Sequence, residues 1–204
     1  MAGARINVPA QVKPLIDKAV ADQLGAVQAR LRNDPSFEQN ARLQWARAVP
    51  ALARALGETD GDLEARFWHG VGRGLYFLPA GRPLARALRE PPHALGRANA
   101  MAGLAWAITL ICLPHPGVLD RFLSRHCGRI EDADSFRHGI AAAALVWCRS
   151  AGQDELLHRL LAYPSQAPER WQAWVRRPCE RALGEQFPIL VRDGGWDELF
   201  RVMQ

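Results

Sequence analysis

The residues best suited to binding chemistry lie in one stretch of the chain, from Glu64 to Tyr76. On a helix, the side chains of Arg66, His69 and Arg73 lie near one side, together with Tyr76. Guanidinium and imidazole groups in such a strip bind carboxylate or phosphate groups through charge-assisted hydrogen bonds. The strip is therefore a candidate binding surface, and a helix-packing face with an ordinary polar rim is the alternative.

Three glycines, Gly70, Gly72 and Gly74, lie within the same stretch. They do not follow a predicted strand, so they are not a dinucleotide-binding fingerprint, and the chain has no phosphate-loop motif. Each glycine inside a helix costs about 0.5–1 kcal/mol relative to alanine. We therefore expect tight backbone contact at these positions, with another helix rather than with a ligand.

Four side chains that could bind a metal lie in a short window, at His126, Cys127, His138 and Cys148. Zinc needs four convergent nitrogen or sulfur ligands, usually paired at close spacings. An adjacent pair followed by gaps of 11 and 10 residues does not match those spacings. We predict no metal site and no cofactor, and we expect His69 and His138 to lie too far apart to share an ion.

Residues with catalytic spacing are scarce. The chain has no G-x-S-x-G motif, and no local signature surrounds any of its four cysteines. The adjacent carboxylates, such as Asp154-Glu155 and Asp197-Glu198, stand where predicted helices begin, so capping and the helix dipole explain them. We predict no catalytic residue, and the sequence favours a binding protein over an enzyme.

Two tryptophans, Trp171 and Trp174, lie among arginines between Pro168 and Pro178. Clusters of aromatic residues and arginine are typical anchors of protein interfaces, and they also stack on single-stranded nucleic acid. Packing of this segment across the end of a helix stack is a third interpretation. We expect both prolines to break the helix around them.

The elements that would position these residues follow a repeated pattern, Leu-x-Arg-x-Leu. Its copies begin at Leu52, Leu84, Leu119 and Leu157, with a degenerate copy at Leu199, at steps of 32, 35, 38 and 42 residues. These steps are in the length range of two-helix repeat units. In each copy the two leucines share a helix face and are predicted to be buried, while the arginine is predicted to reach solvent.

Helical periodicity extends through the chain, and strand signals are nearly absent. The prediction is an all-α fold of helical-hairpin repeats, α-solenoid-like or an irregular right-handed helix stack, with about 9–11 helices and no sheet. Residues 1–60 are expected to form N-terminal helices, with capping of the repeats as one role for them. Residues 61–204 are expected to form the helical-repeat region, packed with them as one domain.

Composition restricts the class of protein further. The chain has 204 residues, 49% of them hydrophobic, which is typical of a globular protein and argues against disorder. Its net charge is +5, and lysine occurs only twice, a bias that a GC-rich bacterial genome explains. The cysteines form no disulfide framework, and the most apolar stretch, residues 98–113, is short for a membrane span. We expect a cytoplasmic, bacterial protein.

The sequence favours a non-enzymatic adaptor, chaperone or assembly factor that binds an extended or helical, acidic segment of another protein. Nucleic-acid binding by the arginine and tryptophan surface is one alternative. A small-molecule enzyme or carrier with a site around His69 and Tyr76 is the other. The predicted contact residues are Arg66, His69, Arg73, Arg86, Arg121, Arg159, Trp171 and Trp174.

Overall fold

The computed structural model describes residues 48–56, 58, 61–77, 87, 89 and 91–202. The chain divides into two compact units, Met1–Val49 and Pro50–Gln204, and nearly all of the described residues belong to the second. The described residues form helices and turns and contain no strand, which confirms the all-α prediction. The predicted helices of residues 1–60 lie almost entirely outside the described residues.

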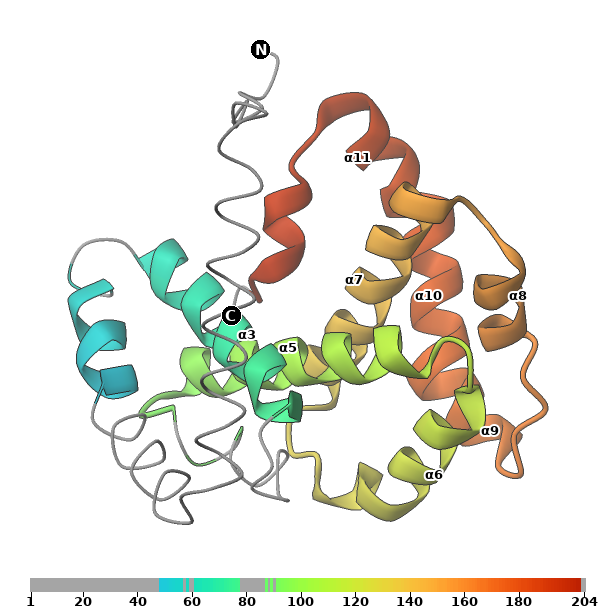
Figure 1. Cartoon of the computed structure of the whole chain (residues 1–204), viewed down its shortest axis with the longest axis horizontal. Helices are drawn as coiled ribbons and strands as arrows, with labels where there is room; N and C mark the ends of the chain where they lie inside the picture. Colours follow the sequence, from blue (N-terminus) through green and yellow to red (C-terminus); the bar gives the residue numbers. More distant parts are fainter. Residues whose placement is uncertain are drawn as a thin grey trace, which may run out of the picture. The chain divides into compact units, whose positions relative to one another are not determined.

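Three long helices form the framework of the described residues (Figure 1). They are α3 (Gly61–Phe77), α5 (Ala94–Cys112) and α7 (Ala133–Ala151). Local signals define where α5 and α7 begin: the side chain of Asp132 accepts a hydrogen bond from the Ser135 amide, and His93 Nδ1 accepts one from the Gly96 amide, 3.0 Å away. Both groups satisfy amide donors that the first helical turn leaves unpaired.

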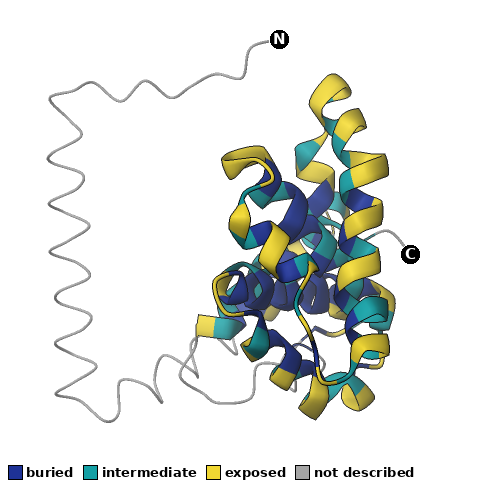
Figure 2. Ribbon diagram, turned by 90° about the vertical axis from the view of Figure 1, so that its right-hand side faces the viewer, coloured by how far each residue is buried: buried dark blue, intermediate teal, exposed yellow. Residues whose placement is uncertain are grey.

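Helix α5 is the central element, because α3 and α7 both pack against it. Its buried residues surround the helix on all sides, so it has no polar stripe. By length and composition α5 is long and apolar enough to cross a membrane, and 72% of its apolar window is buried inside the protein. Figure 2 shows buried residues gathered where the helices meet and exposed residues on their outer sides.

Glycines allow these helices to approach backbone to backbone. A Cβ atom at Gly72 of α3 would overlap the carbonyl group of Ala100 in α5, and one at Gly139 of α7 would overlap the carbonyl group of Ala102. The expectation that the α3 glycines contact another helix is therefore confirmed at Gly72. Gly70 differs, since its Cβ would meet only the end of the Arg73 side chain, at 3.8 Å.

A network of polar side chains joins α3 to the start of α5. Trp68 is fully buried, and its indole N–H donates to Glu64 at 3.1 Å. His93 Nε2 lies 2.6 Å from the same carboxylate. Because His93 Nδ1 accepts from the Gly96 amide, Nε2 carries the proton and donates to Glu64.

The chain from Pro168 to Asp193 is one continuous helical run, formed by α9 (Pro168–Trp171), α10 (Arg177–Arg181) and α11 (Phe187–Asp193) with two π-helical segments between them. The predicted helix break at Pro178 is wrong. The residue before each internal proline, Arg177 or Phe187, instead donates its amide to a carbonyl five residues earlier. A π-helical turn thereby accommodates a proline ring without ending the helix.

The leucines of the Leu-x-Arg-x-Leu pattern are buried in some copies and exposed in another. Both leucines of the copy in α6 (Pro116–His126) are fully buried, and so is Leu157 in α8 (Glu155–Leu161). Leu52 is 51% exposed, so the prediction of burial is wrong there. The arginine of the last copy, Arg201, is mostly buried and forms ion pairs with Asp62 and Glu198, so the predicted exposure is wrong for that copy.

A short segment, residues 196–202, returns across the three long helices. It follows Gly194 and Gly195, whose φ angles of +84° and +79° are strained for other residues. Its first part is the 3-10 turn Trp196–Phe200. Leu199 joins the core beside Leu145 and Ala182, and the Val202 amide donates to Asn99 Oδ1 at 2.7 Å. We call residues 196–202 the crossing segment.

Candidate functional site

The candidate site is an open cleft of about 530 Å³ between α7 and the helical run that contains α10. Its floor is formed by small or apolar residues, among them Ala141 and Ala142 of α7 and Ala182 of the second π-helical segment. Charged side chains surround this floor. The twelve lining residues are Asp134, Arg137, His138, Ala141, Ala142, Ala173, Arg177, Pro178, Arg181, Ala182, Gln186 and Leu199.

Three arginines from two different helices converge on the cleft. Arg137 comes from α7, and Arg177 and Arg181 stand one turn apart on α10. Asp134 is the one carboxylate among the lining residues. Because cations outnumber anions in a concave, partly apolar site, the cleft favours a negatively charged ligand.

The guanidinium group of Arg137 is held in place from two sides. Its Nη1 lies 2.9 Å from Asp134 Oδ1, and its Cζ lies 5.0 Å from the centre of the Trp174 ring. The Trp174 ring in turn meets Phe136 edge to face, with 5.8 Å between ring centres. This stacking fixes the direction of the planar donor group before any ligand binds.

The other two arginines are more accessible. Arg181 Nε lies 3.1 Å from Glu185 in an exposed pair, which water screens and which therefore contributes little stability. Arg177 is exposed and forms no ion pair with any residue that the structure describes. Both guanidinium groups are thus available to an incoming carboxylate.

At its inner end the cleft reaches the crossing segment. His138 Nε2 lies 3.2 Å from the Leu199 carbonyl oxygen, and both residues line the cleft. Burial lowers the pKa of His138, while its hydrogen bond to Leu199 opposes that shift. His138 is therefore a neutral donor at physiological pH and adds a polar but uncharged group to the cleft.

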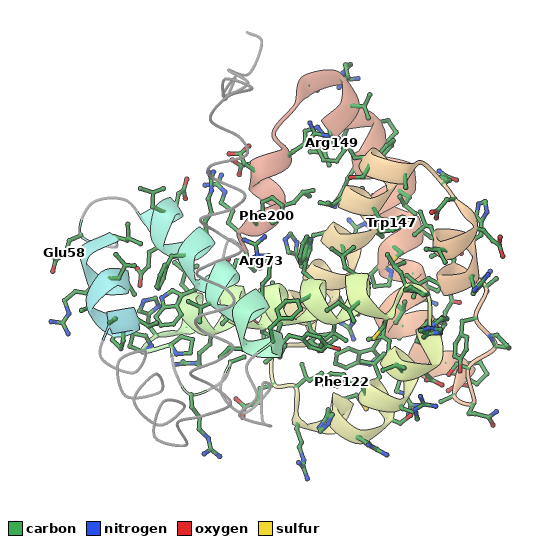
Figure 3. The ribbon with its side chains drawn as sticks, viewed as in Figure 1. Glu58, Arg73, Phe122, Trp147, Arg149 and Phe200 are labelled. Carbon is green, nitrogen blue, oxygen red and sulfur yellow. The ribbon has the colours of Figure 1, made fainter. Side chains whose placement is uncertain are left out.

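His69 and Arg73 lie together beneath the crossing segment, away from the lining of the cleft. His69 is fully buried, and its ring meets the Phe200 ring edge to face at 5.4 Å. Electrostatic repulsion from His138 contributes to lowering the pKa of His69, after burial and Arg73, and the expectation that the two histidines lie too far apart to share an ion stays a prediction. The Arg73 guanidinium lies over the rings of both Trp106 and Phe200. Figure 3 labels Arg73 and Phe200, which lie next to each other in this view.

The remaining predicted contact residues are dispersed. Arg66 binds Asp197 at 2.8 Å, so its charge meets the crossing segment. Arg121 is exposed on α6, and Arg159 is exposed on α8, where it pairs with Glu155 at 2.6 Å. Arg86 lies outside the described residues.

The two predicted tryptophan anchors have different surroundings. Trp171 is 2% exposed and packs against Tyr163 with 5.0 Å between ring centres, so it belongs to the core. Trp174 is partly exposed and supports Arg137 at the edge of the cleft. Among the predicted contact residues that the structure describes, Trp174 thus stacks on a residue that lines the cleft.

Sequence reasoning missed the three arginines of the cleft. One signal was available, because Arg177 and Arg181 are four residues apart and share a helix face. The third, Arg137, comes from another helix, and only packing brings it there. The described residues contain no group of three histidine, cysteine or acidic side chains that could hold a metal ion.

Comparisons with known proteins find no relative: no family model, no curated protein and no solved structure matches this chain.

Proposed function

We propose that this protein is a non-enzymatic binding module, an adaptor, chaperone or assembly factor, which holds an acidic segment of a partner protein in the cleft. The observation that carries the proposal is the convergence of Arg137, Arg177 and Arg181 on one open cleft that contains a single carboxylate. Arginine presents planar, bidentate donors to carboxylates. The small, apolar floor would pack against the aliphatic part of the bound segment.

The size of the cleft also favours a short segment of a larger partner. A volume of about 530 Å³ is in the range of ligand sites, and it is too small to enclose a folded domain. An extended or helical segment that lies across the cleft would bury a few side chains there and leave the rest on the surface. We expect glutamate or aspartate at the positions that face Arg177 and Arg181.

We further propose that the scaffold is a stack of helical hairpins. Two observations support this arrangement: α3, α5 and α7 pack in chain order, and their contacts use glycine at Gly72, Gly103 and Gly139. In such a stack, successive helix pairs present one continuous surface to a partner. The cleft would be one part of that surface.

The proposal is tested with the full chain and a fluorescent glutamate-rich peptide, with the same peptide carrying glutamine as its control. The double change Arg177→Glu and Arg181→Glu should weaken binding of the acidic peptide by about tenfold or more, because two attractive contacts become repulsive. Asp134→Asn should strengthen binding. Binding should also weaken as salt is raised.

The double change Arg121→Glu and Arg125→Glu is the matched control, because both are exposed arginines on α6, one turn apart and outside the lining of the cleft, and the net charge changes by the same amount. It should leave the peptide affinity within about twofold of the starting protein. Equal losses in both variants would show that overall charge, and not the cleft, attracts the peptide. Preferential binding of a single-stranded oligonucleotide, lost in the double variant, would instead support the nucleic-acid alternative.

A further inference from the structure

Three groups that can donate hydrogen bonds lie beneath the Phe200 ring. None of them has a hydrogen-bond acceptor among the described residues. They are the guanidinium of Arg73, the imidazole of His69 and the indole N–H of Trp106. They come from two helices, α3 and α5, and all three contact the same phenyl ring. A phenyl ring accepts no conventional hydrogen bond, so Phe200 covers these donors without providing an acceptor for them.

His69 shows the mismatch most clearly. Its side chain is fully buried, and neither ring nitrogen has a hydrogen-bond partner among the described residues. Burial, then the charge of Arg73, and then repulsion from His138 when that ring is protonated, lower the pKa of His69 to about 3. The ring is therefore neutral, and it keeps one N–H donor buried without an acceptor, which is costly in a protein interior.

Trp106 repeats this pattern on the neighbouring helix. Its Nε1 atom is buried and has no partner in the described part of the chain. The Trp106 ring lies 6.2 Å from the Phe200 ring and 5.2 Å from the Arg73 guanidinium. A buried tryptophan N–H usually finds an acceptor, so Trp106 adds a second unmet donor beside the same phenyl ring.

Arg73 supplies the charge. Its guanidinium lies 5.2 Å from the Trp106 ring and 5.3 Å from the Phe200 ring, and burial lowers its pKa. It forms no ion pair with any described residue, whereas Arg66, earlier in the same helix, pairs with two carboxylates. A partly buried cation is normally matched by an anion.

The group that covers this cluster belongs to the crossing segment, which is held by polar contacts on both sides of Phe200 and by burial of Leu199 in the core. Asp197 and Glu198 bind Arg66, and Asn99 exchanges hydrogen bonds with the Val202 amide and carbonyl. The segment begins after two glycines with positive φ angles, where the backbone has unusual freedom. Phe200 is thus placed so that a rearrangement of the crossing segment uncovers the cluster without unfolding the helices.

We propose that Arg73, His69 and Trp106 form an anion-binding site for a carboxylate or phosphate group, and that Phe200 closes this site in the present structure. A bound oxyanion would pair with the guanidinium and accept hydrogen bonds from the imidazole and indole N–H groups. Carboxylate and phosphate share this chemistry, and the anion comes either from a free small molecule or from a partner's side chain. The site is separate from the arginines of the cleft.

The test opens the site with Phe200→Ala in the full chain and titrates the protein with acetate and with inorganic phosphate. Binding is followed by the ¹⁵N resonances of the His69 imidazole and the Trp106 indole. We expect saturable shifts of both groups and affinity about tenfold tighter than for the unaltered chain, because the closed state no longer competes. Phe77→Ala, an exposed phenylalanine on α3, is the matched control and should change nothing.

A second change separates this site from nonspecific attraction. Arg73→Gln in the Phe200→Ala background should abolish the shifts, whereas Arg177→Glu should leave them intact. If the cleft variants Arg177→Glu and Arg181→Glu do not weaken peptide binding, the test of the Arg73 site is therefore unaffected. If the acidic peptide shifts the His69 and Trp106 resonances and free acetate and phosphate do not, the natural anion is a side chain of a partner.

If Phe200→Ala fails to fold, the titration is repeated with Phe200→Leu, which keeps an apolar side chain at this position. In addition, the melting temperature of the unaltered chain is measured with and without phosphate. A ligand that binds the native state raises the melting temperature with its concentration. The proposal predicts this rise, and predicts its loss in Arg73→Gln. Absence of saturable shifts with acetate, phosphate and the acidic peptide in every folded Phe200 variant, or shifts that survive Arg73→Gln, would overturn it.

Discussion

The backbone of α5 at Gly103 lies directly against the carbonyl group of His69 in α3. A Cβ atom at Gly103 would overlap that carbonyl oxygen, and it would lie 3.1 Å from the Arg73 amide nitrogen. The close contact between α3 and α5 therefore also determines how deeply His69 and Arg73 are buried. Helix packing and the proposed anion site share one structural cause.

Gly103→Ala should destabilise the protein by about 2 kcal/mol or more, because an added methyl group must push two backbones apart. Gly70→Ala is the control on α3, since its Cβ would meet only the flexible end of Arg73. It should be stabilising by about 0.5–1 kcal/mol, the helix preference of alanine over glycine. Denaturation by guanidinium chloride measures both free energies of unfolding, and equal values would contradict this account.

Glu64→Ala should cost about 1–3 kcal/mol of stability, because it leaves the buried Trp68 indole and the His93 imidazole without their shared acceptor. The control is Glu155→Ala, which removes an exposed pair with Arg159 and should cost less than about 0.5 kcal/mol. A double-mutant cycle between Glu64 and His93 then measures their coupling. A coupling of zero would show that this network does not join α3 to α5.

Stability should fall as the pH is lowered from about 6.5 towards 3, partly because of His69. The pKa of its imidazole is about 3 in the folded protein and 6.5 when the ring is exposed to water, so the unfolded chain takes up a proton in this interval and the native state does not. The full effect is up to about 5 kcal/mol. His69→Phe should reduce the slope, with a remainder from His138, whose pKa is also lowered.

The measurement is the free energy of unfolding at a series of pH values for both proteins. The curve of the unaltered chain should fall more steeply with decreasing pH, because the variant has no proton to take up at position 69. Parallel curves would contradict the account. They would show that His69 is protonated equally in the folded and unfolded chains.

Asp120→Ala should destabilise the protein by about 3–5 kcal/mol. This carboxylate is 5% exposed, accepts a hydrogen bond from Ser165 at 2.8 Å and lies 3.6 Å from Arg170, so it joins α6 to the loop before α9. Asp134→Ala, which removes an exposed pair with Arg137, should cost less than about 1 kcal/mol. A similar loss of unfolding free energy in the two variants would show that burial does not increase the contribution of Asp120 to stability.

Local signals predicted most of the helices. Helical periodicity and the turn residues that bound it predict helices at residues 64–78, 97–113 and 134–149, and the structure has α3, α5 and α7 there, each within a few residues. Capping was also predictable, since the Asp154 side chain accepts from the Leu157 amide at 3.0 Å. These features depend on a few adjacent residues, and for that reason a sequence reveals them.

The prolines and the repeated leucines show where local reasoning fails. Pro178 was expected to break a helix, but the hydrogen bond from Arg177 to Gln172 lets the helix continue. Leu52 was expected to be buried, but it is largely exposed, while its counterpart Leu119 is fully buried. Burial depends on which element lies opposite a residue, and the pattern itself does not contain that information.

By itself, the sequence determined the all-α class, the positions of the main helices and the strip that contains Arg66, His69 and Arg73. Only the tertiary structure decided which charges meet. Arg66 is neutralised by Asp197, and Arg137 joins Arg177 at the cleft, across separations of 131 and 40 residues. Helix periodicity and capping act over a few residues, whereas electrostatic partners are set by the packing of distant segments, here through backbone contacts at Gly72, Gly103 and Gly139.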